Sequence, residues 1–86
     1  MNSVYVLISE KDKRSYIGST TCLSRRIGEH NSGKCRATKH RMPLRLVYDE
    51  EFDTVSDARR REKYLKTSPG RRELKKIFDN IAHDWE

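Results

Sequence analysis

Apolar residues gather in short runs along the chain, and three of these runs predict strands. Residues 4–8 are β-branched and aromatic, which is typical of a buried strand. The polar segment 10–14 predicts a turn, and residues 15–19 predict the second strand of a hairpin. A third strand is expected over residues 44–48, and Phe52 either extends this strand or packs back against it.

Apolar residues at helical spacing predict three helices. Thr20 or Thr21 is expected to cap the first, which runs to about residue 30. Ser56 is expected to cap the second, which reaches about residue 66. A break at residues 67–70 precedes the third helix, over residues 71–81. The order ββαβαα predicts a single α/β (α+β) domain over the 86 residues, with a small central antiparallel sheet of about three strands flanked by helices.

The composition narrows the classes of protein that this domain can be. The chain carries 19 Lys and Arg against 13 Asp and Glu, which gives a net charge of +6. No apolar run approaches the roughly 18 residues of a membrane span, and no signal peptide is expected. Two cysteines are too few for a disulfide scaffold. We therefore expect a small cytoplasmic domain with a polyanionic partner, and not a membrane protein, a secreted mini-protein or a metabolic enzyme with a large pocket.

Two polar residues fall on the apolar stripe of the first predicted helix. Arg26 lies three residues after Leu23, and His30 lies three residues after Ile27, so both share the face that should meet the sheet. Each side chain either reaches solvent from the edge of the stripe or serves a function. The presence of two such residues on one stripe favours the functional interpretation.

A carboxylate holds a similar position on the second predicted helix. Ala58 and Leu65 mark the inner face, and Glu62 lies between them. Because burial of an unpaired carboxylate is costly, Glu62 must lie at an edge, form an ion pair or bind a metal cation. The structural alternative is an i,i+4 pair with Lys66, which stabilises a helix by only about 0.3–0.5 kcal/mol.

Tyr5 and Tyr16 lie in the two strands of the predicted hairpin, and the register decides whether they share a face. If the hairpin is centred between Glu10 and Lys11, Tyr5 lies opposite Tyr16. If it is centred one residue later, Tyr5 lies opposite Gly18, and Tyr16 remains on the same face. A hairpin centred on a single residue would separate the tyrosines, and the sequence leaves that register open.

These residues together resemble the GIY-YIG nuclease family over residues 3 to about 76. The two halves of the motif are Ser3-Val4-Tyr5 and Tyr16-Ile17-Gly18, at the family spacing, although Ser3 and Val4 replace the family's Gly and Ile. The segment 66–77 resembles small stand-alone members, which are similar to the N-terminal domain of one of the excinuclease subunits. The other matching positions are Leu23, Arg26, His30, Thr38, Pro43 and the pattern Ala58, Glu62, Lys66.

The resemblance implies a metal-dependent endonuclease that hydrolyses DNA phosphodiester bonds with Mg²⁺ or Mn²⁺ as cofactor. Glu62 would ligate the cation, and Arg26 would hold the scissile phosphate through its forked donors. Tyr5 would activate water or position the base, Tyr16 would orient water or phosphate, and His30 would assist proton transfer. A free tyrosine has a pKa of about 10, so a base role for Tyr5 requires cations or a relay that lower its pKa.

Further residues are expected to contact nucleic acid. Gly18 would let the backbone approach closely, and exposed cations would bind phosphates without reading sequence. The expected phosphate contacts are Lys34, Arg36, Lys39, His40 and Arg41 in a basic surface loop, and Arg59, Arg60 and Lys63 on the second helix.

A zinc site is the other metal site that the sequence suggests. Its ligands would be Cys22, His30, Cys35 and His40. Their spacings differ from the C-x₂₋₄-C pattern of structural zinc sites, which disfavours this interpretation.

Two functions from different classes follow from the sequence. The leading prediction is an endonuclease that selects DNA structure or has weak sequence specificity, with a role in DNA repair. The alternative is a non-catalytic or weakly active module of the same fold that binds DNA or RNA, which the altered first triplet favours. RNA remains open as a substrate. Targeting would come from an accessory protein or from a second copy of the chain.

Overall fold

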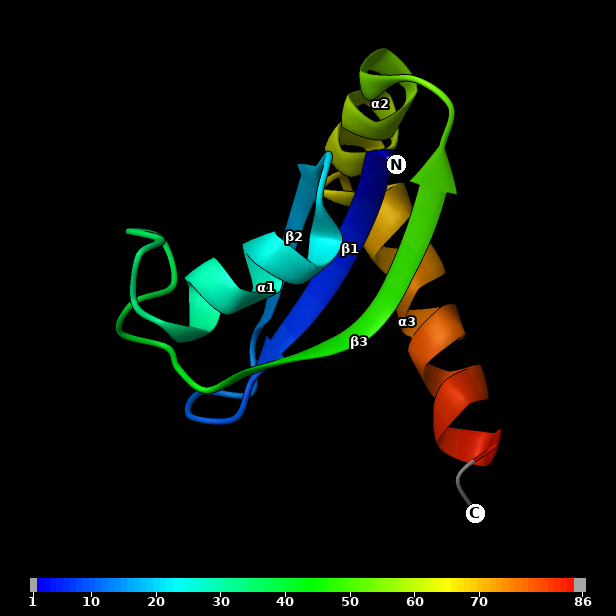
Figure 1. The fold of residues 1–86 in the computed structure, drawn as a ribbon. Coiled ribbons are helices and arrows are strands. Elements are labelled where there is room, and N and C mark those ends of the chain that lie inside the picture. The colour runs from blue at the N-terminus through cyan, green and yellow to red at the C-terminus, as the bar shows by residue number, and fades with distance from the viewer. Residues whose placement is uncertain (1, 85–86) are drawn as a thin grey trace.

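A three-stranded antiparallel sheet lies between one helix and a pair of helices in the computed structural model, which describes residues 2–84 and the side chains of residues 2–79. The elements are β1 (Asn2–Ser9), β2 (Ser15–Thr20), α1 (Leu23–Asn31), β3 (Leu44–Phe52), α2 (Val55–Leu65) and α3 (Ser68–Asp84). Figure 1 shows α1 on one face of the sheet and α2 and α3 on the other. The order ββαβαα confirms the predicted α+β class.

The central strand is the most apolar one. The strand order is β2-β1-β3, and both pairs are antiparallel. Residues Val4 to Leu7 of β1 are all buried, because helices cover both faces of this strand. Strands β2 and β3 form the two edges of the sheet.

Alternation along β1 divides the apolar residues between two clusters. Val4 and Val6 pack with Ala58 and Leu65 on the face that α2 and α3 cover. Tyr5 and Leu7 point to the other face, where Leu23 and Ile27 of α1 pack against them. The side chains of Tyr5 and α1 therefore meet on one face of the sheet.

The hairpin adopts the second of the registers that the sequence allows. Tyr5 pairs with Gly18, and Leu7 pairs with Tyr16, so the turn is centred between Lys11 and Asp12. Tyr5 and Tyr16 consequently share a face, with ring centroids 6.3 Å apart.

The first helix and the third strand differ from the prediction at their ends. Phe52 pairs with Asn2, so β3 runs beyond residues 44–48 and the predicted alternative in which Phe52 extends the strand is confirmed. The N-cap of α1 is Cys22, and the prediction of Thr20 or Thr21 was wrong. Thr20 ends β2, and its hydroxyl accepts a hydrogen bond from the Cys22 backbone N–H at 3.2 Å, which holds the connection and does not cap the helix.

The ends of α2 and α3 also correct the prediction. Thr54, and not Ser56, caps α2, because its hydroxyl is three residues before Asp57 and accepts that residue's N–H at 3.1 Å. Helix α3 begins at Ser68 and not near residue 71, because Pro69 is compatible with a first helical turn. The side chain of Ile81, the last residue of the predicted third helix, lies outside the described residues. None of the helices in the described part of the chain combines the length and hydropathy that a membrane span requires.

Candidate active site

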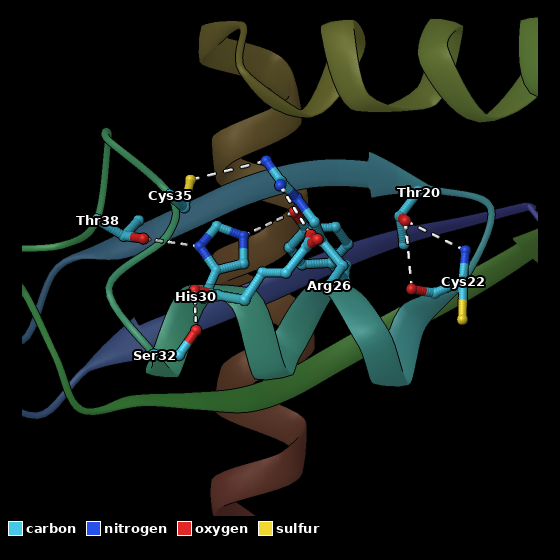
Figure 2. Close-up of polar contacts among 9 residues, drawn as sticks. Thr20, Cys22, Arg26, His30, Ser32, Cys35 and Thr38 are labelled. Atoms are coloured by element: carbon cyan, nitrogen blue, oxygen red, sulfur yellow. Dashed lines mark hydrogen bonds and ion pairs between the residues drawn. The ribbon is translucent and has the colours of Figure 1, made fainter.

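Tyr5, His30 and Thr38 form a buried chain of hydrogen bonds. The Tyr5 hydroxyl lies 2.9 Å from Nε2 of His30, and Nδ1 of His30 lies 2.7 Å from the Thr38 hydroxyl. All three side chains are at most 1% exposed. Figure 2 shows His30 reaching from α1 to Thr38 in the loop that follows the helix. The chain of bonds therefore joins the central strand, the first helix and this loop.

Burial sets the protonation states of this chain. It raises the pKa of Tyr5 to about 12, although the nearby Arg26 guanidinium acts in the opposite direction. Burial, together with Arg26, lowers the pKa of His30 below its ordinary value of 6.5. At neutral pH His30 is therefore a neutral imidazole with one donating and one accepting ring nitrogen, and hydrogen bonds join Nε2 to the Tyr5 hydroxyl and Nδ1 to the Thr38 hydroxyl. The lowered Tyr5 pKa that a base role requires is absent, but the hydrogen-bonded relay is present.

Tyr16 and Gly18 complete this cluster from the edge strand β2. The Tyr16 ring lies 4.9 Å from the His30 ring between centroids, at 63°. A Cβ on Gly18 would lie 2.5 Å from the Tyr5 hydroxyl oxygen, so only glycine leaves room for the phenol at this position. Gly18 therefore seats Tyr5 in the structure, whereas the sequence suggested a close approach of the backbone to nucleic acid.

Arg26 lies one turn before His30 on α1. One terminal nitrogen of its guanidinium donates to Glu29 at 3.1 Å, and the other lies 3.7 Å from the Cys35 sulfur. The side chain is 34% exposed, and Figure 2 shows it extending from the same side of α1 as His30. Since a guanidinium has five N–H donors, Arg26 keeps donors for an anion beside the tyrosines.

Glu62 reaches β2 from the opposite face of the sheet. Its Oε1 accepts a hydrogen bond from the Ser19 hydroxyl at 2.6 Å, and its Oε2 accepts one from Lys66 at 2.7 Å. Burial by itself raises the pKa of Glu62, but these hydrogen bonds outweigh it and hold the pKa below the ordinary value. The carboxylate is thus ionised, 22% exposed and paired with Lys66 as the structural alternative predicted.

The donor set around Glu62 fits a cation of the magnesium type. No group of three or more His, Cys, Asp or Glu residues gathers within the described residues. Mg²⁺ needs only one or two carboxylates, because it keeps several waters and binds substrate phosphates. Lys66 is half exposed and can leave the carboxylate. Both nitrogens of His30 are engaged by Tyr5 and Thr38, which disfavours the zinc set that includes it.

The predicted phosphate contacts are exposed with one exception. Lys34, Arg36, Lys39 and His40 are exposed, whereas Arg41 pairs with Asp12 at 2.9 Å. Buried Cys35 and Thr38 anchor the loop that carries these cations. The predicted contacts on α2, Arg59, Arg60 and Lys63, are all exposed.

Sequence reasoning missed the partners that hold the site residues in place. Ser19 lies 43 positions before Glu62, and no periodicity connects the two. Cys35 beside Arg26 was considered only as a zinc ligand. Thr38 was noted as a family match, which was the only signal for its bond to His30.

Comparisons with known proteins identify the family to which the chain belongs. Residues 1–75 match the GIY-YIG catalytic domain. A UPF0213 protein of Staphylococcus haemolyticus is 45% identical over 75 residues, which span 85% of this chain and 92% of the relative. A UPF0213 protein of Staphylococcus saprophyticus is 40% identical over 81 residues, or 92% and 99% of the two chains. The solution NMR structure of a UPF0213 protein from Bacillus halodurans has a TM-score of 0.54 and 37% identity, covering 90% of this chain and 85% of that one.

Proposed function

Because this chain belongs to the GIY-YIG family, we propose that it is a metal-dependent endonuclease that hydrolyses DNA phosphodiester bonds. The observation that carries the proposal is the convergence of Tyr5, Tyr16, Arg26 and His30 beside the one strand that also anchors Glu62. Each of these side chains is held by a neighbour, so the groups are positioned before a substrate arrives.

Arg26 and Tyr16 bind the phosphate in the proposed mechanism. The guanidinium offers its remaining donors to two phosphate oxygens, and it stabilises the negative charge that grows in the transition state. The Tyr16 hydroxyl orients the phosphate or the attacking water from the edge of β2.

Tyr5 and His30 remove the proton from the attacking water. The Tyr5 hydroxyl passes its own proton to Nε2 of His30 as it accepts one from water, so a free phenolate is never required. Thr38 holds Nδ1 of His30 and thereby keeps Nε2 directed at Tyr5.

Glu62 would hold Mg²⁺ or Mn²⁺ in this mechanism, with Lys66 displaced from the carboxylate. A bound divalent cation supplies Lewis-acid stabilisation of the phosphate and of the leaving oxygen. The Ser19 hydroxyl keeps Glu62 oriented when Lys66 leaves, because it bonds the other carboxylate oxygen.

The test is nicking of supercoiled plasmid, branched DNA and RNA by the purified chain, with Mg²⁺ or with chelator. Glu62→Gln should abolish Mg²⁺-dependent cleavage and retain DNA binding in chelator, because it removes only the metal ligand. The control is Glu51→Gln, which removes an exposed carboxylate of β3 and should cleave like the wild type. Wild-type rates in Glu62→Gln would make the non-catalytic binding module the better interpretation.

A further inference from the structure

A groove of about 850 Å³ lies between the edge strand β2 and helix α3. None of the sequence motifs pointed to it. Its volume lies within the range of about 300–1,000 Å³ that is typical of sites for organic ligands.

The floor of the groove is apolar and aromatic. Ile17 and Leu74 are buried in the core beneath it, and Phe78 of α3 packs half-buried against the same core. Tyr16 lines the groove from β2. Phe78 therefore places an aromatic ring in the floor of a cavity that is open to solvent, whereas the Tyr16 ring lies on the other face of the sheet beside His30.

The rim of the groove is basic. Arg14, Arg71 and Lys75 are exposed, and none of them forms an ion pair within the described part of the chain. The acidic residue of the lining, Asp12, is neutralised by Arg41 at 2.9 Å. The rim is therefore complementary to an anionic polymer.

The groove adjoins both halves of the candidate active site. Tyr16 lines the groove and also lies 4.9 Å from the His30 ring. Lys66 lines it as well, and its ammonium binds Glu62 at 2.7 Å. A strand whose phosphate sits beside Tyr16 can continue directly into the groove.

We propose that this groove binds an unpaired DNA segment next to the scissile phosphate, so that the enzyme selects single-stranded or branched DNA over continuous duplex. An apolar, aromatic floor with a cationic rim is the arrangement that binds unstacked bases and their phosphates together. The bases of a duplex are stacked inside the helix and cannot reach such a floor. The choice of DNA as the polymer rests on the proposed function.

The test measures binding in chelator, so that it does not depend on cleavage. Fluorescence anisotropy compares a labelled single strand, the duplex of the same sequence and the corresponding RNA strand. Phe78→Leu keeps apolar volume in the core and removes the aromatic face, and it should weaken single-strand binding by roughly five-fold or more. Arg71→Ala and Lys75→Ala should each weaken it several-fold.

Matched controls lie on the same helix. Arg72→Ala and Lys76→Ala remove the same charge from exposed neighbours that do not line the groove, and both should bind the single strand like the wild type. Melting temperatures of all five variants establish that each is folded.

Three outcomes would overturn the inference. The first is equal loss in the control variants, which would mean that only net charge matters. The second is equal loss on duplex, and the third is a clear preference for the RNA strand. Plasmid nicking separates this inference from the proposed function. If the wild type cleaves DNA and the groove variants bind single strands normally, only the groove proposal is refuted. If the wild type never cleaves but the groove variants lose single-strand binding, only the nuclease proposal is refuted.

Discussion

At the scale of single residues, the proposed mechanism gives Tyr5 and His30 a joint task that neither can perform alone at neutral pH. A phenol whose pKa is about 12 is almost wholly protonated near pH 7, so Tyr5 is a poor base without an acceptor. His30 is neutral there because burial lowers its pKa, and its Nε2 lies 2.9 Å from the hydroxyl. The reaction therefore depends on the neutral form of His30.

The pH dependence of cleavage should show this requirement. The pKa of folded His30 lies below 6.5, so the neutral acceptor persists as the pH falls through 6.5 and is lost only at lower pH. We expect the Mg²⁺-dependent nicking rate of the wild type to fall at acidic pH with a midpoint below 6.5. The nicking rate of Tyr5→Phe should be lower by roughly 10²-fold or more at every pH. An acidic midpoint at or above 6.5 would contradict the relay.

Gly18 offers a test of the space around Tyr5. In Gly18→Ala the new Cβ would lie 2.5 Å from the Tyr5 hydroxyl oxygen, so the ring must move and its bond to His30 must lengthen. We expect a stability loss of about 1–3 kcal/mol and a fall in nicking rate of roughly ten-fold or more. Gly28→Ala is the control, since Gly28 is exposed on α1 and nothing lies within 4 Å of its added Cβ. Normal cleavage by Gly18→Ala would show that the position of Tyr5 is not critical.

At the scale of elements, one arginine joins α2 to two neighbours. Arg61 donates to Glu50 of β3 at 2.8 Å and also pairs with Glu73 of α3. The Tyr48 hydroxyl donates to the same Glu50 carboxylate at 2.8 Å. Since α2 carries Glu62, this network holds the proposed metal ligand in place relative to the sheet.

Arg61→Ala should therefore destabilise the fold more than Arg60→Ala does. Its guanidinium is 23% exposed and holds two carboxylates, so its loss should lower the free energy of unfolding by about 1–2 kcal/mol. Arg60→Ala removes a side chain that is 80% exposed and should change it by about 0.5 kcal/mol or less. Urea unfolding measures both variants, and equal values would show that the network adds no stability.

The sequence predicted the strands and helices more accurately than the residues at their ends or the contacts of their side chains. Alternation and helical spacing identified three strands and three helices, and these patterns also placed Arg26, His30 and Glu62 on inward faces. The caps were wrong because several hydroxyls compete near each helix start, and backbone geometry decides among them. The groove between β2 and α3 was missed because its sides are separated by about fifty residues in sequence, and no local pattern reports such a contact.

At the scale of the whole molecule, the two edges of the sheet differ in charge. The β2 edge borders the basic groove, whereas β3 carries Asp49, Glu50 and Glu51. This asymmetry should orient an approaching polyanion toward β2, where Tyr16 and Ser19 hold the two halves of the site.

The salt dependence of binding should report that asymmetry. Three cations of the groove rim, Arg14, Arg71 and Lys75, together with Arg26 of α1 are the proposed phosphate contacts, which predicts a log–log salt slope of about −3 for a single strand. Arg71→Ala should make the slope less negative by about 0.7, because the loss of one phosphate contact lowers the number of counterions released on binding. Glu51→Lys adds positive charge at the far edge and should leave the slope unchanged, since it makes no phosphate contact. Equilibrium binding in chelator between about 50 and 200 mM salt measures all three slopes. A slope near zero in the wild type would remove the nucleic-acid interpretation, and an equal slope in Arg71→Ala would move the contacts away from the groove.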